Sequence, residues 1–167
     1  MNNSTEEKFS LKFTPLGGLG QIGANMSLIE GTDEGIIVDT GILFPRERNF
    51  GISYLISDFY TVDKKKFKAL IITHAHEDHL GAIHKLLEYH PSIEIWAPKF
   101  AAFVLKEKLQ ETGQHHNINI YDHGHDFEFK NFTIKTFQVN HSTPHSFGLY
   151  IKTQEDYKAF WDHYLKE

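Results

Sequence analysis

The chain has 167 residues, of which 40% are hydrophobic and 23% are charged, with 12 histidines and no cysteine. This composition is that of one globular domain or part of one, and it excludes disulfides and thiolate metal sites. The net charge of −5 argues against binding to nucleic acid by bulk electrostatics, and no apolar run approaches the roughly 20 residues that cross a bilayer. We therefore expect a cytoplasmic protein without a membrane segment.

The chain begins with two predicted strands joined by a glycine-rich turn. Residues 1–8 are polar and acidic and are expected to form a disordered tail, and the alternation in residues 9–14 predicts a strand. Residues 17–23 contain a Gly-x-Gly-x-x-Gly pattern that matches a dinucleotide-binding fingerprint. Such a fingerprint must open a helix, whereas residues 25–30 after it are typical of a strand. We interpret the glycines as turn residues and keep a nucleotide site as the weaker alternative.

A short buried strand is predicted at residues 36–38, and it ends in Asp39. An acid at this point either caps the turn or helps to orient a metal ligand, and the sequence favours neither. Residues 42–60 are predicted to be irregular. The basic run at residues 64–68 follows, and a solvated face before the next strand explains it.

The most informative segment follows an apolar strand predicted at residues 69–73. His74, His76, Asp78 and His79 lie within six positions. Imidazole nitrogens and carboxylate oxygens are ligands that Zn²⁺ takes from proteins. On an extended strand end His74 and His76 point to the same side, and a turn can bring the next two ligands to a second position. The segment therefore predicts a site for up to two zinc ions; the alternative is a histidine-rich polar loop.

Strands and helices alternate after this segment. Asp78 is a natural N-cap for a helix over residues 80–90, residues 93–97 form a strand, and Pro98 opens a helix that ends before Gly113. This alternation favours an α/β layered fold. The apolar face of the second helix is predicted to contain Phe100, Phe103, Val104 and Leu109. The other histidines of this region are interpreted as surface or packing residues: His84, His90, His115, His116, His123 and His125.

A hairpin is predicted over residues 127–137, and the chain then enters a loop rich in Ser, Thr and Pro. His141 ends a strand at the start of this loop. Because a catalytic zinc takes three protein ligands and keeps an open position, His141 is the best candidate for a further ligand. His145 and Ser142 in the same loop are candidates for contact with substrate, and the alternative for His145 is a loop residue with no role.

The last predicted element is an amphipathic helix over residues 154–167, with apolar side chains at helical spacing. Asp162 falls on this helix instead of at a strand end. We therefore do not expect it to be a metal ligand. The division of the chain that follows is a tail over residues 1–8, a domain over residues 9–153 and this helix.

The motifs together resemble a known family. His74-x-His76-x-Asp78-His79 with His141 resembles the metallo-β-lactamase superfamily of two-zinc hydrolases. The segments at residues 17–26, 39–45, 57–59, 72–82 and 140–148 sharpen the match, and as a set they resemble the N-terminal part of the ribonuclease J family. The resemblance runs from about residue 9 to residue 153.

This resemblance implies an αββα sandwich, of which the chain is the N-terminal part, with the site at its mouth. It implies hydrolysis of RNA phosphodiester bonds, from the 5′ end or internally, with Asp78 orienting the attacking hydroxide. By the family pattern, one zinc is held by His74, His76 and His141, the second takes Asp78 and His79, and Asp39 supports the ligands.

The chain also departs from the family pattern. The family continues with a strand ending in a Gly-Asp pair, whose aspartate bridges both metals, and much later adds another histidine ligand; neither is visible here. We therefore expect a truncated chain whose second metal position is half built. A partner chain or a missing C-terminal region would complete it, and a homo-oligomer is a separate expectation. The competing functions are a catalytically incompetent metal-binding or interaction domain, and another hydrolase of the superfamily that acts on thioesters or lactones.

Overall fold

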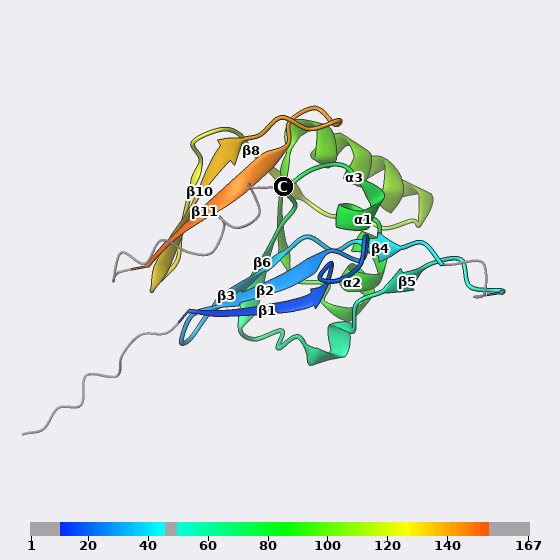
Figure 1. The fold of residues 1–167 in the computed structure, drawn as a ribbon, viewed down its shortest axis with the longest axis horizontal. Coiled ribbons are helices and arrows are strands. Elements are labelled where there is room, and N and C mark those ends of the chain that lie inside the picture. Colours follow the sequence, from blue (N-terminus) through cyan, green and yellow to red (C-terminus); the bar gives the residue numbers. More distant parts are fainter. Residues whose placement is uncertain (1–10, 46–49, 154–167) are drawn as a thin grey trace, which may run out of the picture.

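The computed structural model describes residues 11–45 and 50–153. The predicted tail over residues 1–8 and the predicted C-terminal helix, which includes Asp162, lie outside this part of the chain. Most of the described strands belong to two sheets, which Figure 1 shows as neighbouring layers.

The larger sheet has six strands in the order β1-β2-β3-β6-β7-β8. Its first three strands are antiparallel neighbours, whereas β3, β6, β7 and β8 run parallel. The parallel strands therefore end at the same edge of the sheet, where loops can gather polar side chains. The strand bounds are β1 Lys12–Gly17, β2 Met26–Glu30, β3 Gly35–Val38, β6 Phe67–Ile71, β7 Glu94–Pro98 and β8 Ile118–Tyr121.

The smaller sheet has three antiparallel strands in the order β11-β10-β9, and a separate two-stranded ribbon joins β4 to β5. The bounds in the smaller sheet are β9 Asp126–Glu128, β10 Phe132–Gln138 and β11 Phe147–Thr153. The ribbon consists of β4 Ile42–Leu43 and β5 Leu55–Ile56. The helices are η1 Phe59–Thr61, α1 Glu77–Leu80, α2 Ile83–Tyr89 and α3 Lys99–Glu111.

The six-stranded sheet is covered on both faces. Successive side chains of a strand point to opposite sides, so each central strand contributes to two hydrophobic clusters. In β3, Ile37 packs with the helices, and its neighbours Ile36 and Val38 pack with the smaller sheet. In β6, Leu70 faces the helices and Ile71 faces the smaller sheet. The described residues thus form three layers: helices, large sheet and small sheet (Figure 1).

This arrangement confirms the expected mixed α/β fold, in the layer order of an αββα sandwich up to its second sheet. The strand predicted at residues 25–30 is present as β2, so the glycine-rich loop opens no helix. Residues 42–60, predicted to be irregular, contain the β4–β5 ribbon and η1. No helix among the described residues is long and apolar enough to cross a membrane.

Two details of the helix predictions are wrong. The N-cap of α1 is His76, and Asp78 lies inside the first turn, where its side chain bonds to a distant residue instead of capping. Phe103 is 60% exposed, because the buried face of α3 is set by Ala101, Leu105 and their neighbours. Helical spacing alone does not decide between two overlapping apolar stripes.

Candidate metal centre

The site is built where β3 and β6 end side by side. Asp39 follows β3 with a φ of 60°, a left-handed conformation that Asp tolerates better than most residues. Its backbone N–H donates to Ile71 O at 3.0 Å, and its buried carboxylate accepts from Thr73 N at 2.7 Å and Thr73 Oγ1 at 2.9 Å. The two strand ends are therefore tied together by one carboxylate.

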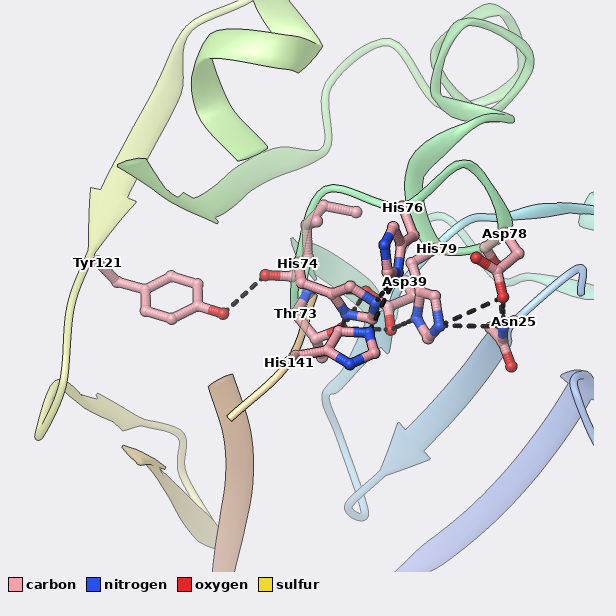
Figure 2. A network of polar contacts seen from close by, with 10 residues as sticks. Asn25, Asp39, Thr73, His74, His76, Asp78, His79, Tyr121 and His141 are labelled. Carbon is pink, nitrogen blue, oxygen red and sulfur yellow. Dashed lines mark hydrogen bonds and ion pairs between the residues drawn. The ribbon is translucent and has the colours of Figure 1, made fainter. Parts of the chain in front are cut away.

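Three imidazoles converge next to Asp39 and Thr73, as Figure 2 shows. His76 Nδ1 lies 3.1 Å from His74 Nε2 and 3.1 Å from His141 Nε2, and one ligand atom from each ring lies within 4.8 Å of the others. Two nitrogens bound to a tetrahedral zinc lie about 3.4 Å apart, given Zn–N bonds of about 2.0–2.1 Å. The three histidines therefore fit a single divalent cation.

In His74 and His76, the ring nitrogen that points away from the cluster is hydrogen-bonded, and the other ring nitrogen is free to bind a metal. A carboxylate can only accept, so the Thr73 hydroxyl donates to Asp39, and His74 Nδ1–H then donates to Thr73 Oγ1 at 2.9 Å. His76 Nε2 lies 3.2 Å from Ser142 Oγ, which can accept a hydrogen bond from the Nε2–H. In this arrangement the lone pairs of His74 Nε2 and His76 Nδ1 face the cluster, as metal ligation requires.

A second pair of ligand atoms lies beside the first group. Asp78 Oδ2 and His79 Nε2 are 3.6 Å apart. His79 Nδ1–H donates to Asp39 Oδ2 at 2.8 Å, which leaves Nε2 with its lone pair. Asp39 therefore contacts His79 directly and His74 through Thr73, so that its carboxylate orients two imidazoles instead of capping the turn that follows β3.

Asn25 is a member of this site that the sequence reasoning did not single out. It comes from the loop between β1 and β2, and its Nδ2 donates to Asp78 Oδ2 at 3.0 Å and to Asp78 O at 3.1 Å. The glycine-rich segment before it leaves room for this side chain, because Gly18 has a φ of 84° and a Cβ there would lie 2.3 Å from Asn25 Oδ1. Thr73 is a second such member, since the sequence predicts only a strand residue there and the structure bonds it to Asp39 and His74.

The remaining predicted residues lie at the edge of the site. Ser142 contacts the second nitrogen of His76, and His145 is exposed, with a φ of 54°, and does not line the adjoining cavity. To one side of the site in Figure 2, Tyr121 is buried and donates to Ile72 O at 2.7 Å, which holds the chain just after β6.

The protonation states of two histidines are shifted by their surroundings. Burial, aided by the neighbouring imidazoles, lowers the pKa of His74 to about 4, so the ring is neutral at pH 7 and able to bind a metal. Burial also acts to lower the pKa of His79, but the carboxylates of Asp39 and Asp78 outweigh it and raise that pKa. The second position is thus already arranged to hold positive charge.

A cavity of about 600 Å³ opens beside the metal ligands. Its walls come from the β1–β2 loop, the end of β3, the loop after β6 and the strands β10 and β11. The volume is within the usual range for sites that bind small molecules or parts of larger ligands. Residues that line it include Leu19, Asn25, His74, His79, Phe137, Asn140 and His141.

Comparison with known proteins gives a consistent result. Residues 19–156 match the family model described as the metallo-β-lactamase superfamily. The chain is 43% identical over 144 residues to ribonuclease J 1 of Streptococcus pyogenes serotype M3 and 39% identical over 150 residues to ribonuclease J of Mycoplasma pneumoniae. These matches cover 84% and 87% of the chain but 26% of each relative.

The solved structures agree on the fold. A metallo-β-lactamase fold protein from Bacillus subtilis is 18% identical, with a TM-score of 0.59 over 84% of the chain and 57% of that protein. At this identity the likeness concerns the fold alone. The chain spans about a quarter of the length of the curated relatives it matches. The described residues have the same fold as the solved metallo-β-lactamase fold protein.

Proposed function

The chain belongs to the metallo-β-lactamase superfamily, and we propose that it is the metal-binding module of a ribonuclease J-type hydrolase acting on RNA phosphodiester bonds. The observation that carries this proposal is the convergence of His74, His76 and His141 at one point beside a cavity. The relatives named ribonuclease J support the choice of RNA as substrate. We propose 5′ exonuclease or endonuclease activity, or both, and location in the cytoplasm.

Zinc is the metal we propose for the site. Neutral imidazoles and a carboxylate are ligands that suit zinc, and the chain contains no thiolate. Up to two ions would be held, one by the three-histidine group and one by Asp78 with His79. Such a cation supplies Lewis-acid chemistry, which activates water near neutral pH and neutralises the charge that develops on phosphate oxygens.

The residues of the chain would position the reactants around this chemistry. Asp39 and Thr73 hold the imidazoles in the required tautomers, so no reorganisation is needed when substrate binds. Asp78 would accept a hydrogen bond from the attacking water and orient it toward phosphorus. Water then adds to the phosphorus, the P–O bond breaks, and the leaving oxygen takes up a proton. Ser142 and His145, in the loop at the mouth of the site, are proposed to contact the RNA.

One observation favours a second candidate function, a metal-binding module without turnover. Within residues 11–45 and 50–153, the second metal position gathers two ligands, Asp78 and His79. A two-metal hydrolase needs both cations to bind attacking and leaving oxygens. A partner chain or a further part of the protein would then supply the remaining ligands. Hydrolysis of a thioester or lactone has less support, because the relatives are ribonucleases.

RNA cleavage by the zinc-loaded chain tests the proposal. The substrate is a 5′-monophosphorylated RNA oligomer with a 3′ label, incubated with the chain after zinc addition or with a chelator. We expect zinc-dependent cleavage that is lost in His76→Ala and retained in His115→Ala, an exposed histidine of a distant loop. About one bound zinc ion per chain without cleavage would favour the non-catalytic module.

A further inference from the structure

The side chain of Asn25 stands between the two ligand atoms of the second metal position. Its Nδ2 lies 3.0 Å from Asp78 Oδ2 and 3.1 Å from His79 Nε2, and these two atoms are 3.6 Å from each other. Figure 2 shows the three side chains meeting at this point, away from the three-histidine group. An amide N–H₂, which carries partial positive charge, thus faces the two atoms that would bind a cation.

The orientation of the amide follows from its neighbours. Asp78 Oδ2 and Asp78 O can only accept hydrogen bonds, so the amide nitrogen must face them and the amide oxygen must point away. His79 Nδ1 donates to Asp39, so that in the neutral ring, the form that binds a metal, Nε2 presents a lone pair. Asn25 Nδ2–H donates to this lone pair.

This hydrogen bond and metal binding at His79 exclude each other. A carboxylate oxygen has two lone pairs and can accept an N–H while it binds a cation, whereas an imidazole nitrogen has one. The amide of Asn25 must leave His79 Nε2 before a metal binds there. We propose that Asn25 is a place-holder at the second metal position, which keeps its two ligands occupied in the metal-free chain and sets how tightly the second cation binds.

The backbone around the ligands does not depend on the Asn25 side chain. Asn25 N donates to Asp78 O at 2.9 Å, Gly41 N donates to Asn25 O at 3.0 Å, and Thr40 N donates to His79 O at 2.7 Å. Any residue other than proline at position 25 keeps the first two bonds, and His79 remains held by Asp39. A substitution at Asn25 therefore changes the competition for the ligand atoms more than their positions.

Two substitutions follow from this reasoning, which rests on the metal-binding function proposed above. Asn25→Ala removes the competing donor, and we expect the second zinc to bind about 2- to 10-fold more tightly, the worth of one net hydrogen bond. Asn25→Asp replaces the donor with a carboxylate in reach of the same cation. We expect this variant to bind the second zinc more tightly by about tenfold or more, because carboxylate is itself a zinc ligand.

Isothermal titration of Zn²⁺ into the metal-free full chain tests the proposal, with circular dichroism as the check on folding. Asn117→Asp, which adds the same charge at an exposed position, is the matched control and should leave the titration unchanged. Adding His79→Ala to Asn25→Asp should abolish the tighter second binding event. If Asn25→Asp does not fold, the change in affinity for the second zinc in Asn25→Ala tests the proposal alone, and tighter binding supports it.

The outcomes separate this inference from the proposed function. A second event that is unchanged or weaker in the folded Asn25 variants, one that survives His79→Ala, or a single event in wild type and both Asn25 variants overturns the place-holder role while leaving the three-histidine site intact. A purely structural role for Asn25 predicts weaker binding. Absence of any zinc binding in wild type and variants would overturn the proposed function and this inference together.

Discussion

Replacing Asp39 by Asn should destabilise the metal-free chain, because no amide can reproduce what the carboxylate does. One oxygen accepts from Thr73 N at 2.7 Å and the other accepts from His79 Nδ1 at 2.8 Å. An amide has one oxygen, so its N–H₂ must face a donor on one side or force His79 into the other tautomer. That tautomer would carry a proton at Nε2, opposite the amide of Asn25.

The expected loss is that of one hydrogen bond to a charged group in a buried site, about 1.5–3 kcal/mol in the free energy of unfolding. For a chain of this size it corresponds to a fall in Tm of about 3–12 °C. Asparagine tolerates the left-handed φ of 60° at this position, so backbone strain adds little.

Urea denaturation followed by circular dichroism, in the presence of a chelator, measures this loss. Asp63→Asn is the matched control, since Asp63 is exposed and accepts from Lys65 N at 2.8 Å within a local turn. It should change the unfolding free energy by less than about 0.5 kcal/mol. The account of Asp39 would be refuted if Asp39→Asn were as stable as the control.

Two further predictions concern a close backbone contact and pH. Gly41→Ala should destabilise the chain by more than about 1 kcal/mol and weaken zinc binding, because its Cβ would lie 1.6 Å from Asp78 O; calorimetry and zinc titration measure both effects. Burial acts to raise the pKa of Glu30, but Lys66 and Lys12 outweigh it and lower that pKa below 4.5. The resulting stability is present above pH 4.5 and is lost as pH falls through the folded pKa, so Glu30→Gln should flatten the acid limb of a stability–pH curve; an unchanged limb would contradict this.

Local patterns in the sequence were sufficient for much of the fold. The apolar runs that became β3 and β6 were recognised because a doubly covered sheet needs nearly continuous hydrophobic strands. The ligands at residues 74–79 were recognised because they are adjacent in the chain. His141 lies 65 residues from His76, and its place after a strand indicates it as a ligand only together with the need of a zinc for a third ligand and the family resemblance.

The contacts that complete the site could not be derived in this way. Asn25 and Asp78 are 53 residues apart, and their bond depends on how the β1–β2 loop folds over α1. For the same reason Asp78 was expected to cap a helix: a lone Asp before an apolar run is typical of an N-cap, and nothing local reveals a distant amide that binds it instead. Long-range polar pairing is set by tertiary structure, which periodicity does not encode.

We propose above all that His74, His76 and His141 form a metal-binding centre. Counting zinc by mass spectrometry on the purified chain, after zinc addition and removal of the excess, tests it most directly. His76 contacts both other rings, so the account predicts at least one zinc per wild-type chain, retention of that zinc in His115→Ala, and its loss in His76→Ala. A wild-type chain that remains free of zinc, or a His76→Ala chain that binds as much as wild type, would contradict it.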